Sequence, residues 1–352
     1  MGGVLVRTPE GLTAAWAQRV VDARSAGVTV SAVETLSVDV GTTTRVRLSV
    51  EHDGDLPRRW FVKIPSGSWK ARAITALPRL PHTEVRFYNE VAGLLPIARP
   101  TALAAVSRLG RGFTLVLEDV TERGGTPGDP GDVLSAEQAG GVVDLLAALH
   151  ARMWEDPCLE QLAWLGGPVR RLEDGLGSAL AVPLMKRGLE RAGDAVPEAL
   201  HGPALGYARR RRHAMKTLAD GPRTLIHHDC HPGNLYWEGA VPGLLDWQLV
   251  RIGEGVGDVA YLLATALDPD TRREAEQDLL RRYHAGLVAA GVPAPEPARL
   301  RERYRAHLTY AFEAMVVTLA VGGLMDDDVA TRLVRRAALA VADQEAFGAF
   351  EP

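Results

Sequence analysis

The segment that most constrains the fold spans residues 225–248 and reads LIHHDCHPGNLYWEGAVPGLLDWQ. Its apolar start predicts a short strand. Alternate side chains on a strand share a face, so His227 and Asp229 are expected to point the same way. A Pro-Gly turn then delivers Asn234 beside Asp229.

The second half of this segment predicts a hairpin. Residues 235–237 and 243–245 are apolar and β-prone, and Gly239 lies in the turn between them. The return strand brings Asp246 back to the starting end, so one amide and two carboxylates are expected to converge. Phosphoryl transfer needs such groups, because an alcohol must give up a proton and Mg²⁺ takes one or two carboxylates from protein.

A zinc site is the alternative reading, since residues 227–231 are His-His-Asp-Cys-His. Zinc ligands converge on a tetrahedron from positions that a turn or a loop separates. Five contiguous residues alternate between two faces and do not meet this requirement. The segment therefore favours phosphoryl transfer.

The pattern His227-x-Asp229-x-x-x-x-Asn234, followed by Asp246, resembles the catalytic loop and metal-binding Asp of the protein-kinase-like fold. The His-Pro-x-Asn-Leu and Leu-Asp-Trp variants are similar to the aminoglycoside phosphotransferase and choline-kinase-like families. The resemblance implies that Asp229 is the catalytic base and that Asn234 and Asp246 hold Mg²⁺. It also implies that His227 and Asp258 brace the loop. The fold it implies is α+β and bilobal, with a small antiparallel N-lobe and a larger, mainly helical C-lobe.

Composition sets the limits of this interpretation. A chain of 352 residues predicts two domains or lobes, and 46% hydrophobic with 24% charged residues is typical of a globular protein. A net charge of −4 argues against a general nucleic-acid or anionic-membrane binder, and two cysteines imply no disulfide framework. The sequence starts without a signal-peptide pattern, and the longest apolar run, residues 314–325, is shorter than the roughly 20 residues that span a bilayer. We expect a cytoplasmic protein without membrane partners.

The first lobe begins with an expected helix over residues 12–23, with Thr8 as its N-cap. Expected strands follow at residues 30–36, 38–40, 46–50 and 60–64. In a kinase-like fold the turn containing Gly41, Thr42 and Thr43 lies over the nucleotide phosphates, and Lys63 reaches them. The apolar neighbours of Lys63 predict a buried strand, where an unpaired ammonium would be costly.

Two further nucleotide contacts are implied by resemblance. Residues 83–91 have helical periodicity and resemble the Glu-x-x-Phe-Tyr pattern of ecdysteroid-kinase-like phosphotransferases, which selects Glu84 over Glu90 as the partner of Lys63. The strand over residues 112–120 ends in a Leu-Glu-Asp hinge typical of the same families. That likeness implies that the C=O of Glu118 and the N–H of Val120 bind the adenine edge.

The lobe boundary is expected between Val120 and Ser135, giving lobes of residues 1–120 and 121–352. Ser135 begins a capping box for a helix over residues 136–154, in which His150 is expected to be a hydrogen-bonded core histidine. The run of arginines at residues 209–212 is interpreted as a solvated helix face. The further helices are expected at residues 176–192, 203–218, 259–266, 271–290, 297–320 and 329–347.

The acceptor is expected to be small. Only eleven residues separate Asp246 from Asp258, and no Ala-Pro-Glu triplet follows, so there is no long segment to dock a peptide. Glu254, Asp268 and Asp270 are candidate substrate residues, because carboxylates lining a cleft would pair with the ammonium groups of a cationic antibiotic. The alternative for Asp268 and Asp270 is helix capping, which the sequence favours.

The leading hypothesis is an ATP- and Mg²⁺-dependent O-phosphotransferase that modifies a cationic antibiotic and confers resistance. GTP is an open alternative as phosphoryl donor. A kinase of a neutral or choline-like metabolite and a nucleotide-binding pseudokinase scaffold are the alternative functions. The sequence leaves the oligomeric state open.

Overall fold

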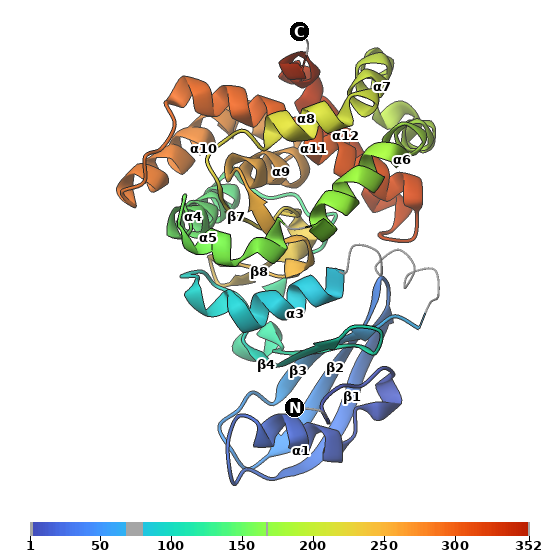
Figure 1. Ribbon diagram of the computed structural model, residues 1–352, viewed down its shortest axis with the longest axis vertical. Coiled ribbons are helices and arrows are strands. Elements are labelled where there is room, and N and C mark those ends of the chain that lie inside the picture. Colours follow the sequence, from blue (N-terminus) through green and yellow to red (C-terminus); the bar gives the residue numbers. More distant parts are fainter. Residues whose placement is uncertain (1–2, 68–79, 167, 351–352) are drawn as a thin grey trace. The chain divides into compact units, whose positions relative to one another are not determined.

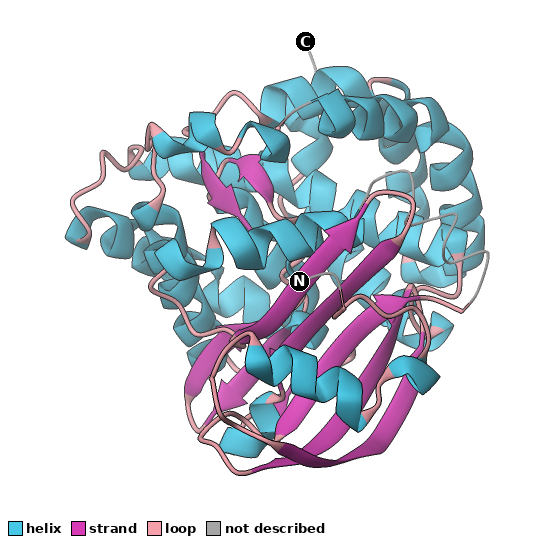
Figure 2. Cartoon of the chain, turned by 60° about the horizontal axis from the view of Figure 1, so that its bottom comes forward, coloured by secondary structure: helices cyan, strands magenta, loops and turns pink. Residues whose placement is uncertain are grey.

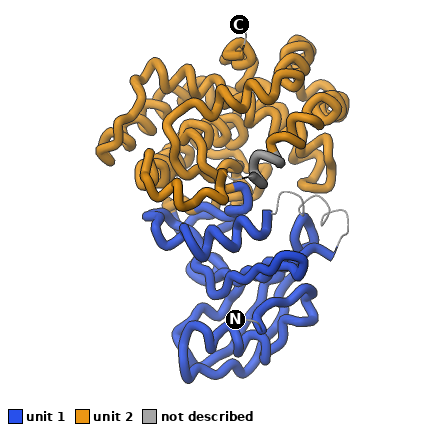
Figure 3. The backbone as a smooth tube through the Cα atoms, in the orientation of Figure 1, with its two compact units in different colours: residues 1–127, 236–239, 244–249 blue, residues 128–235, 240–243, 250–352 orange. Residues whose placement is uncertain are grey.

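The computed structural model describes residues 3–67, 80–166 and 168–350. Its internal contacts divide the chain into two compact units (Figure 3). Unit 1 comprises Met1–Pro127, Tyr236–Gly239 and Leu244–Leu249, and unit 2 comprises Gly128–Leu235, Ala240–Gly243 and Val250–Pro352. The chain first passes from unit 1 to unit 2 between Pro127 and Gly128, and two short later segments belong to unit 1. The expected lobe boundary stays a prediction.

Unit 1 contains a five-stranded antiparallel sheet with the order β1-β2-β3-β5-β4 (Figures 1 and 2). Its strands are β1 (Val30–Val40), β2 (Thr43–His52), β3 (Arg59–Pro65), β4 (Ala102–Arg108) and β5 (Gly112–Glu118). The two strands expected before Gly41 are one continuous strand with a register shift between Thr35 and Ser37. The sequence analysis missed β4, because its alanine-rich sequence has weak β propensity.

The first helix of unit 1, α1 (Ala14–Asp22), packs its apolar side on this sheet. Trp16 and Trp60 are fully buried there, and their rings pack edge to face with their centroids 6.0 Å apart. The expected N-cap was wrong. The Thr13 side chain caps α1 by accepting from the N–H of Trp16, while Thr8 precedes a separate 3-10 turn, Pro9–Gly11.

The helix α3 (Leu80–Glu90) explains why the segment Leu244–Leu249 belongs to unit 1. Phe87 of α3 stacks on Trp247, with ring centroids 4.1 Å apart and an interplanar angle of 9°. Trp247 begins the 3-10 turn Trp247–Leu249. Burial of two large aromatic rings against each other fixes this turn to α3.

The expected hairpin after the catalytic loop is present. Strands β8 (Leu235–Glu238) and β9 (Val241–Leu244) follow each other in a small sheet of order β6-β8-β9, where β6 is Thr126–Pro127. Gly239, in the turn, has φ +61°, a conformation that glycine adopts without a steric penalty.

Unit 2 is mainly helical, as expected. Its helices are α4 (Ala136–Arg152), α5 (Cys158–Gln161), α6 (Pro168–Ala192), α7 (His201–Arg209), α8 (Arg211–Leu218), α9 (Val256–Ala266), α10 (Pro269–Ala289), α11 (Pro297–Val321) and α12 (Asp327–Asp343). The capping box of Ser135 and Gln138 is confirmed. The single helix expected over residues 203–218 was wrong, since the chain breaks at Arg210 into α7 and α8.

The strands β7 (Thr224–Ile226) and β10 (Arg251–Gly253) pair antiparallel in unit 2. Among the helices of the described residues, none is long and apolar enough to cross a bilayer.

Candidate active site

The loop that carries Asp229 follows β7 in unit 2 and ends in the 3-10 turn Pro232–Asn234. The Asn234 side chain turns back onto Asp229. Its Nδ2 donates to the backbone oxygen of Asp229 at 2.9 Å and to Oδ2 at 3.0 Å. The structure thus brings Asn234 beside Asp229, as the Pro-Gly turn in the sequence suggested.

A buried carboxylate braces the same loop from α9. Asp258 is 1% exposed, and its oxygens accept from the backbone N–H groups of His227 at 2.7 Å and His228 at 2.8 Å. Its Oδ2 also lies 3.2 Å from Nε2 of His150, whose Nδ1 meets the Tyr283 hydroxyl at 2.9 Å. His150 is therefore the hydrogen-bonded core histidine expected from the sequence. Asp258 makes the contacts that a loop brace requires.

The structure adds one residue that the sequence analysis missed. The hydroxyl of Tyr261 donates to Oδ1 of Asp229 at 2.8 Å. Burial, reinforced by the Asp229 carboxylate, raises the pKa of Tyr261 well above its ordinary value, so the hydroxyl stays a neutral donor. The missed signal was its spacing, because Tyr261 lies three residues after Asp258 and shares its face of α9.

Unit 1 holds a second polar group around Lys63 in the middle of β3. This lysine is only 5% exposed, and its Nζ lies 2.8 and 3.0 Å from the oxygens of Glu84 and 3.2 Å from Oδ1 of Asp246. Burial acts to lower the pKa of Lys63, but the carboxylates of Asp246 and Glu84 outweigh it and raise the pKa. Glu90, in contrast, pairs with Arg86 on an exposed face of α3.

The two carboxylates compete for one ammonium. Burial raises the pKa of Glu84 to about 7, while Lys63 and the N–H of Trp247, which donates to Oε1 at 3.3 Å, act in the opposite direction. Asp246 itself has φ +57° and His228 has φ +71°. Such left-handed conformations cost energy in residues other than glycine and are often retained at functional sites.

Asp229 and Asn234 lie in unit 2, and Asp246 lies in unit 1. The expected convergence of all three side chains stays a prediction. What the structure provides is two ordered polar groups, one in each unit, connected through the β8–β9 hairpin.

The remaining nucleotide-contact predictions fall on backbone turns of unit 1. Gly41 begins the turn between β1 and β2, where its N–H donates to the Thr43 oxygen at 3.0 Å and its C=O accepts from Ser66 at 2.8 Å. Thr42 follows in the same turn. Glu118 ends β5 and Val120 begins the 3-10 turn Val120–Arg123. Their nucleotide contacts stay predictions.

The three candidate substrate carboxylates are engaged within unit 2. Glu254 is 4% exposed and lies 2.9 Å from Nε2 of His307, with Nε of Arg303 donating to it at 2.7 Å. Burial alone would raise the pKa of Glu254, but hydrogen bonds from His307 and Arg303 lower it.

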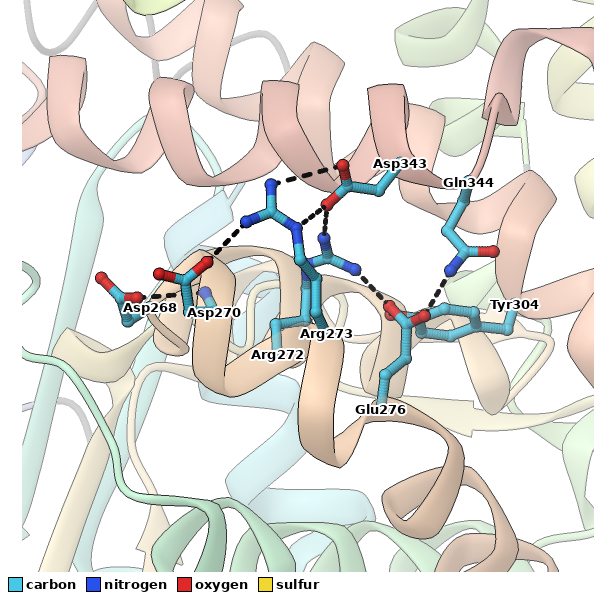
Figure 4. Close-up of polar contacts among 8 residues, drawn as sticks. All are labelled: Asp268, Asp270, Arg272, Arg273, Glu276, Tyr304, Asp343 and Gln344. Carbon is cyan, nitrogen blue, oxygen red and sulfur yellow. Dashed lines mark hydrogen bonds and ion pairs between the residues drawn. The ribbon is translucent and has the colours of Figure 1, made fainter.

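Figure 4 shows the other two carboxylates at the start of α10. Asp268 caps this helix by accepting from the N–H of Asp270 at 3.1 Å, and Asp270 pairs with Arg273 at 2.6 Å. Capping by Asp268, which the sequence favoured, is confirmed. Each of the three carboxylates thus has a structural partner.

The zinc alternative finds no support. Cys230 is fully buried, and burial raises the pKa of its thiol well above the usual range, which disfavours the thiolate that zinc binds. In the described part of the chain, no group of three His, Cys, Asp or Glu side chains is placed to hold a metal ion.

Comparisons with known proteins agree with this geometry. The sequence model of the phosphotransferase enzyme family matches residues 42–302. No curated protein sequence matches the chain.

Three solved structures are similar in fold. The GDP complex of wild-type aminoglycoside 2'-phosphotransferase-IIIa is 15% identical, with a TM-score of 0.53 over 93% of this chain and 98% of that chain. Ethanolamine kinase of Plasmodium vivax is 9% identical, with a TM-score of 0.50 over 97% and 90%. Choline kinase of Cryptosporidium parvum is 11% identical, with a TM-score of 0.50 over 91% of each chain.

These likenesses confirm the expected kinase-like, bilobal α+β fold. The family model covers more than half of the sequence and includes the motif residues from Lys63 to Asp258. The chain therefore belongs to the phosphotransferase enzyme family.

Proposed function

We propose that this protein transfers the γ-phosphoryl group of ATP to a hydroxyl of a small molecule, with Asp229 as the catalytic base. The observation that carries the proposal is the hydrogen bonding of the Asp229 carboxylate. Tyr261 donates to one of its oxygens at 2.8 Å and Asn234 to the other at 3.0 Å. A carboxylate fixed at both oxygens can accept the proton of an attacking alcohol in a defined geometry.

The donor set fits Mg²⁺. The Asn234 amide nitrogen is used on Asp229, which leaves its oxygen, a hard ligand, as the group to face a cation. Asp246 adds a carboxylate whose side chain is 25% exposed. When bound, Mg²⁺ would neutralise phosphate oxygens. Asn234 and Asp246 would hold it.

Lys63 supplies the positive charge for the nucleotide phosphates in this proposal. Its pairing with Glu84 in a buried strand keeps the ammonium charged and in one position. The turn at Gly41, Thr42 and Thr43 would cover the phosphates, and the backbone of Glu118 and Val120 would meet the base. A cytoplasmic location, where ATP and Mg²⁺ are abundant, belongs to the same proposal.

The chemical class of the molecule that accepts the phosphoryl group is a separate part of the proposal. A cationic antibiotic was favoured because of Glu254, Asp268 and Asp270, but these carboxylates are occupied by arginine, histidine or backbone N–H groups. A bound polycation would have to displace the partners of Glu254, which is buried, whereas Asp268 and Asp270 are exposed and keep free acceptor capacity. The contacts of Glu254 therefore weaken the case for a cationic antibiotic with a role in resistance and support the alternative class, a neutral or choline-like metabolite.

The test is a mass-spectrometric screen of hydroxylated metabolites and antibiotics with the purified protein, Mg²⁺, and ATP or GTP. A product gains about 80 daltons, the mass of one phosphoryl unit. Asp229→Ala should abolish turnover and leave nucleotide binding nearly intact. Retained turnover in that variant would defeat the assignment of the base.

Asp270→Ala is the matched control, because Asp270 is an exposed carboxylate of the same unit. It should leave turnover unchanged. If it instead raised the KM of a cationic acceptor, and the gene supported growth in that antibiotic, the cationic class would be restored.

A further inference from the structure

The arginine run at residues 209–212 lines a cavity that the proposed function does not use. The cavity measures about 430 Å³, within the range of roughly 300–1,000 Å³ that is usual for small-molecule sites. Its lining comprises Arg209, Arg210, Arg211, Arg212 and His213 from the junction of α7 and α8, together with Ser178 and Ala179 of α6 (Figure 1). We call this feature the arginine cavity.

The charge of the arginine cavity is not compensated. Among the described residues, its lining includes no carboxylate, and Arg209, Arg210 and Arg212 have no ion-pair partner. Arg211 alone is paired, with Glu313. Elsewhere in unit 2, Arg303 pairs with Glu254. Several positive charges facing one hollow repel each other and attract an anion.

The helix break places the arginines at two helix ends, because Arg209 lies in the last turn of α7, where a basic residue is favourable, whereas Arg211 and Arg212 begin α8. The chain leaves helical geometry at Arg210, with φ −104° and ψ 17°, and α8 begins at Arg211. Basic residues at a helix N-terminus oppose the helix dipole, whereas acidic residues there are stabilising. Within the described residues no side chain caps the N-terminus of α8.

We propose that the arginine cavity binds a small polyphosphate anion. Guanidinium groups donate paired hydrogen bonds to phosphate oxygens, and N–H groups at the start of a helix can add donors. The ligand is small because the charged surface is concave and limited to a few residues. A nucleic acid or an anionic membrane would instead favour an extended basic surface, and the chain as a whole carries a net charge of −4.

The probe is inorganic tripolyphosphate, titrated into the full chain by calorimetry at two salt concentrations. The test variant is the triple substitution Arg209→Gln, Arg210→Gln and Arg212→Gln, which keeps the Arg211–Glu313 pair. The control is Arg335→Gln, since Arg335 is an exposed arginine of α12 outside the cavity. Vesicles of phosphatidylcholine and phosphatidylserine form a second arm.

Wild-type protein and the control should bind one equivalent of tripolyphosphate more than the triple variant. The triple variant should bind tripolyphosphate at this site about 100-fold more weakly, because the loss of each exposed charge contact lowers the affinity roughly 5-fold. The affinity of the wild-type site should also fall as the salt concentration rises. Tripolyphosphate that binds at a nucleotide site should still bind to the triple variant. The test of the arginine cavity is therefore independent of whether the proposed phosphotransferase function is correct.

Two results would overturn the assignment. One is equal stoichiometry and affinity in the wild type and the triple variant. The other is that the wild-type protein does not bind tripolyphosphate but binds the anionic vesicles, and that the triple variant loses this vesicle binding.

Discussion

The hydrogen bond from Tyr261 to Asp229 provides a direct test of how the proposed catalytic base is positioned. Tyr261 is 2% exposed, and its hydroxyl lies 2.8 Å from Oδ1 of Asp229. Tyr261→Phe removes this hydroxyl and keeps the ring that packs in α9. Asn234 still holds the other oxygen of Asp229 in the variant, so the carboxylate loses one of two side-chain donors.

The expected size of the effect follows from the bond type. A hydrogen bond to a charged group contributes about 1.5–3 kcal/mol, and each 1.36 kcal/mol of barrier changes the rate tenfold. Tyr261→Phe should therefore lower kcat by about 10- to 150-fold if the whole contribution is expressed in the transition state. The KM for ATP should change little, because Tyr261 contacts the proposed base and not Lys63, the proposed phosphate contact.

The assay is steady-state phosphorylation of an acceptor found by the screen, combined with thermal denaturation. Tyr304→Phe is the matched control. Tyr304 is equally buried in unit 2 and donates to the carboxylate of Glu276 at 2.7 Å, in a cluster that contains no catalytic-loop residue (Figure 4). Tyr304→Phe should lower stability and leave kcat unchanged. Wild-type kcat in Tyr261→Phe, or an equal loss in both variants, would refute the reasoning.

Three other substitutions test the polar groups of each unit. Glu84→Gln weakens the fixation of Lys63 and should reduce kcat/KM for ATP by about 10- to 150-fold, whereas Glu90→Gln on the exposed face should have no effect. Glu276→Ala removes a buried carboxylate that pairs with an arginine, and it should lower the free energy of unfolding, measured in urea, by about 3–5 kcal/mol. A decrease below about 1 kcal/mol would show that neighbouring carboxylates compensate for the lost partner. Glu254 has a lowered pKa, so the stability that its ionised form contributes is present above its unfolded pKa and is lost as pH falls through the folded one. Glu254→Gln should therefore be most destabilising near pH 7, and its difference in Tm from wild type should shrink between about pH 5 and pH 3.

The sequence was most informative where the chemistry depends on local spacing. The separation of Asp229 and Asn234 by a Pro-Gly turn already placed the amide beside the carboxylate. A lysine between apolar residues on a strand indicated a buried ammonium that needs a partner, whereas Glu84 was selected as that partner by resemblance to known phosphotransferases. These relations depend on the pleat of a strand, on a turn and on one helix. Each of these is set within a few residues.

The tertiary structure decided how distant elements meet. It put Trp247 against Phe87, so the segment after β9 joins unit 1, and it brought Tyr261 of α9 onto Asp229. It also paired Glu254 with Arg303, a residue 49 positions away, so this candidate substrate carboxylate has a structural partner. Local patterns predict which face of an element is buried or polar. They do not predict which partner from another element will compensate a buried charge, because that choice depends on the packing of the whole unit.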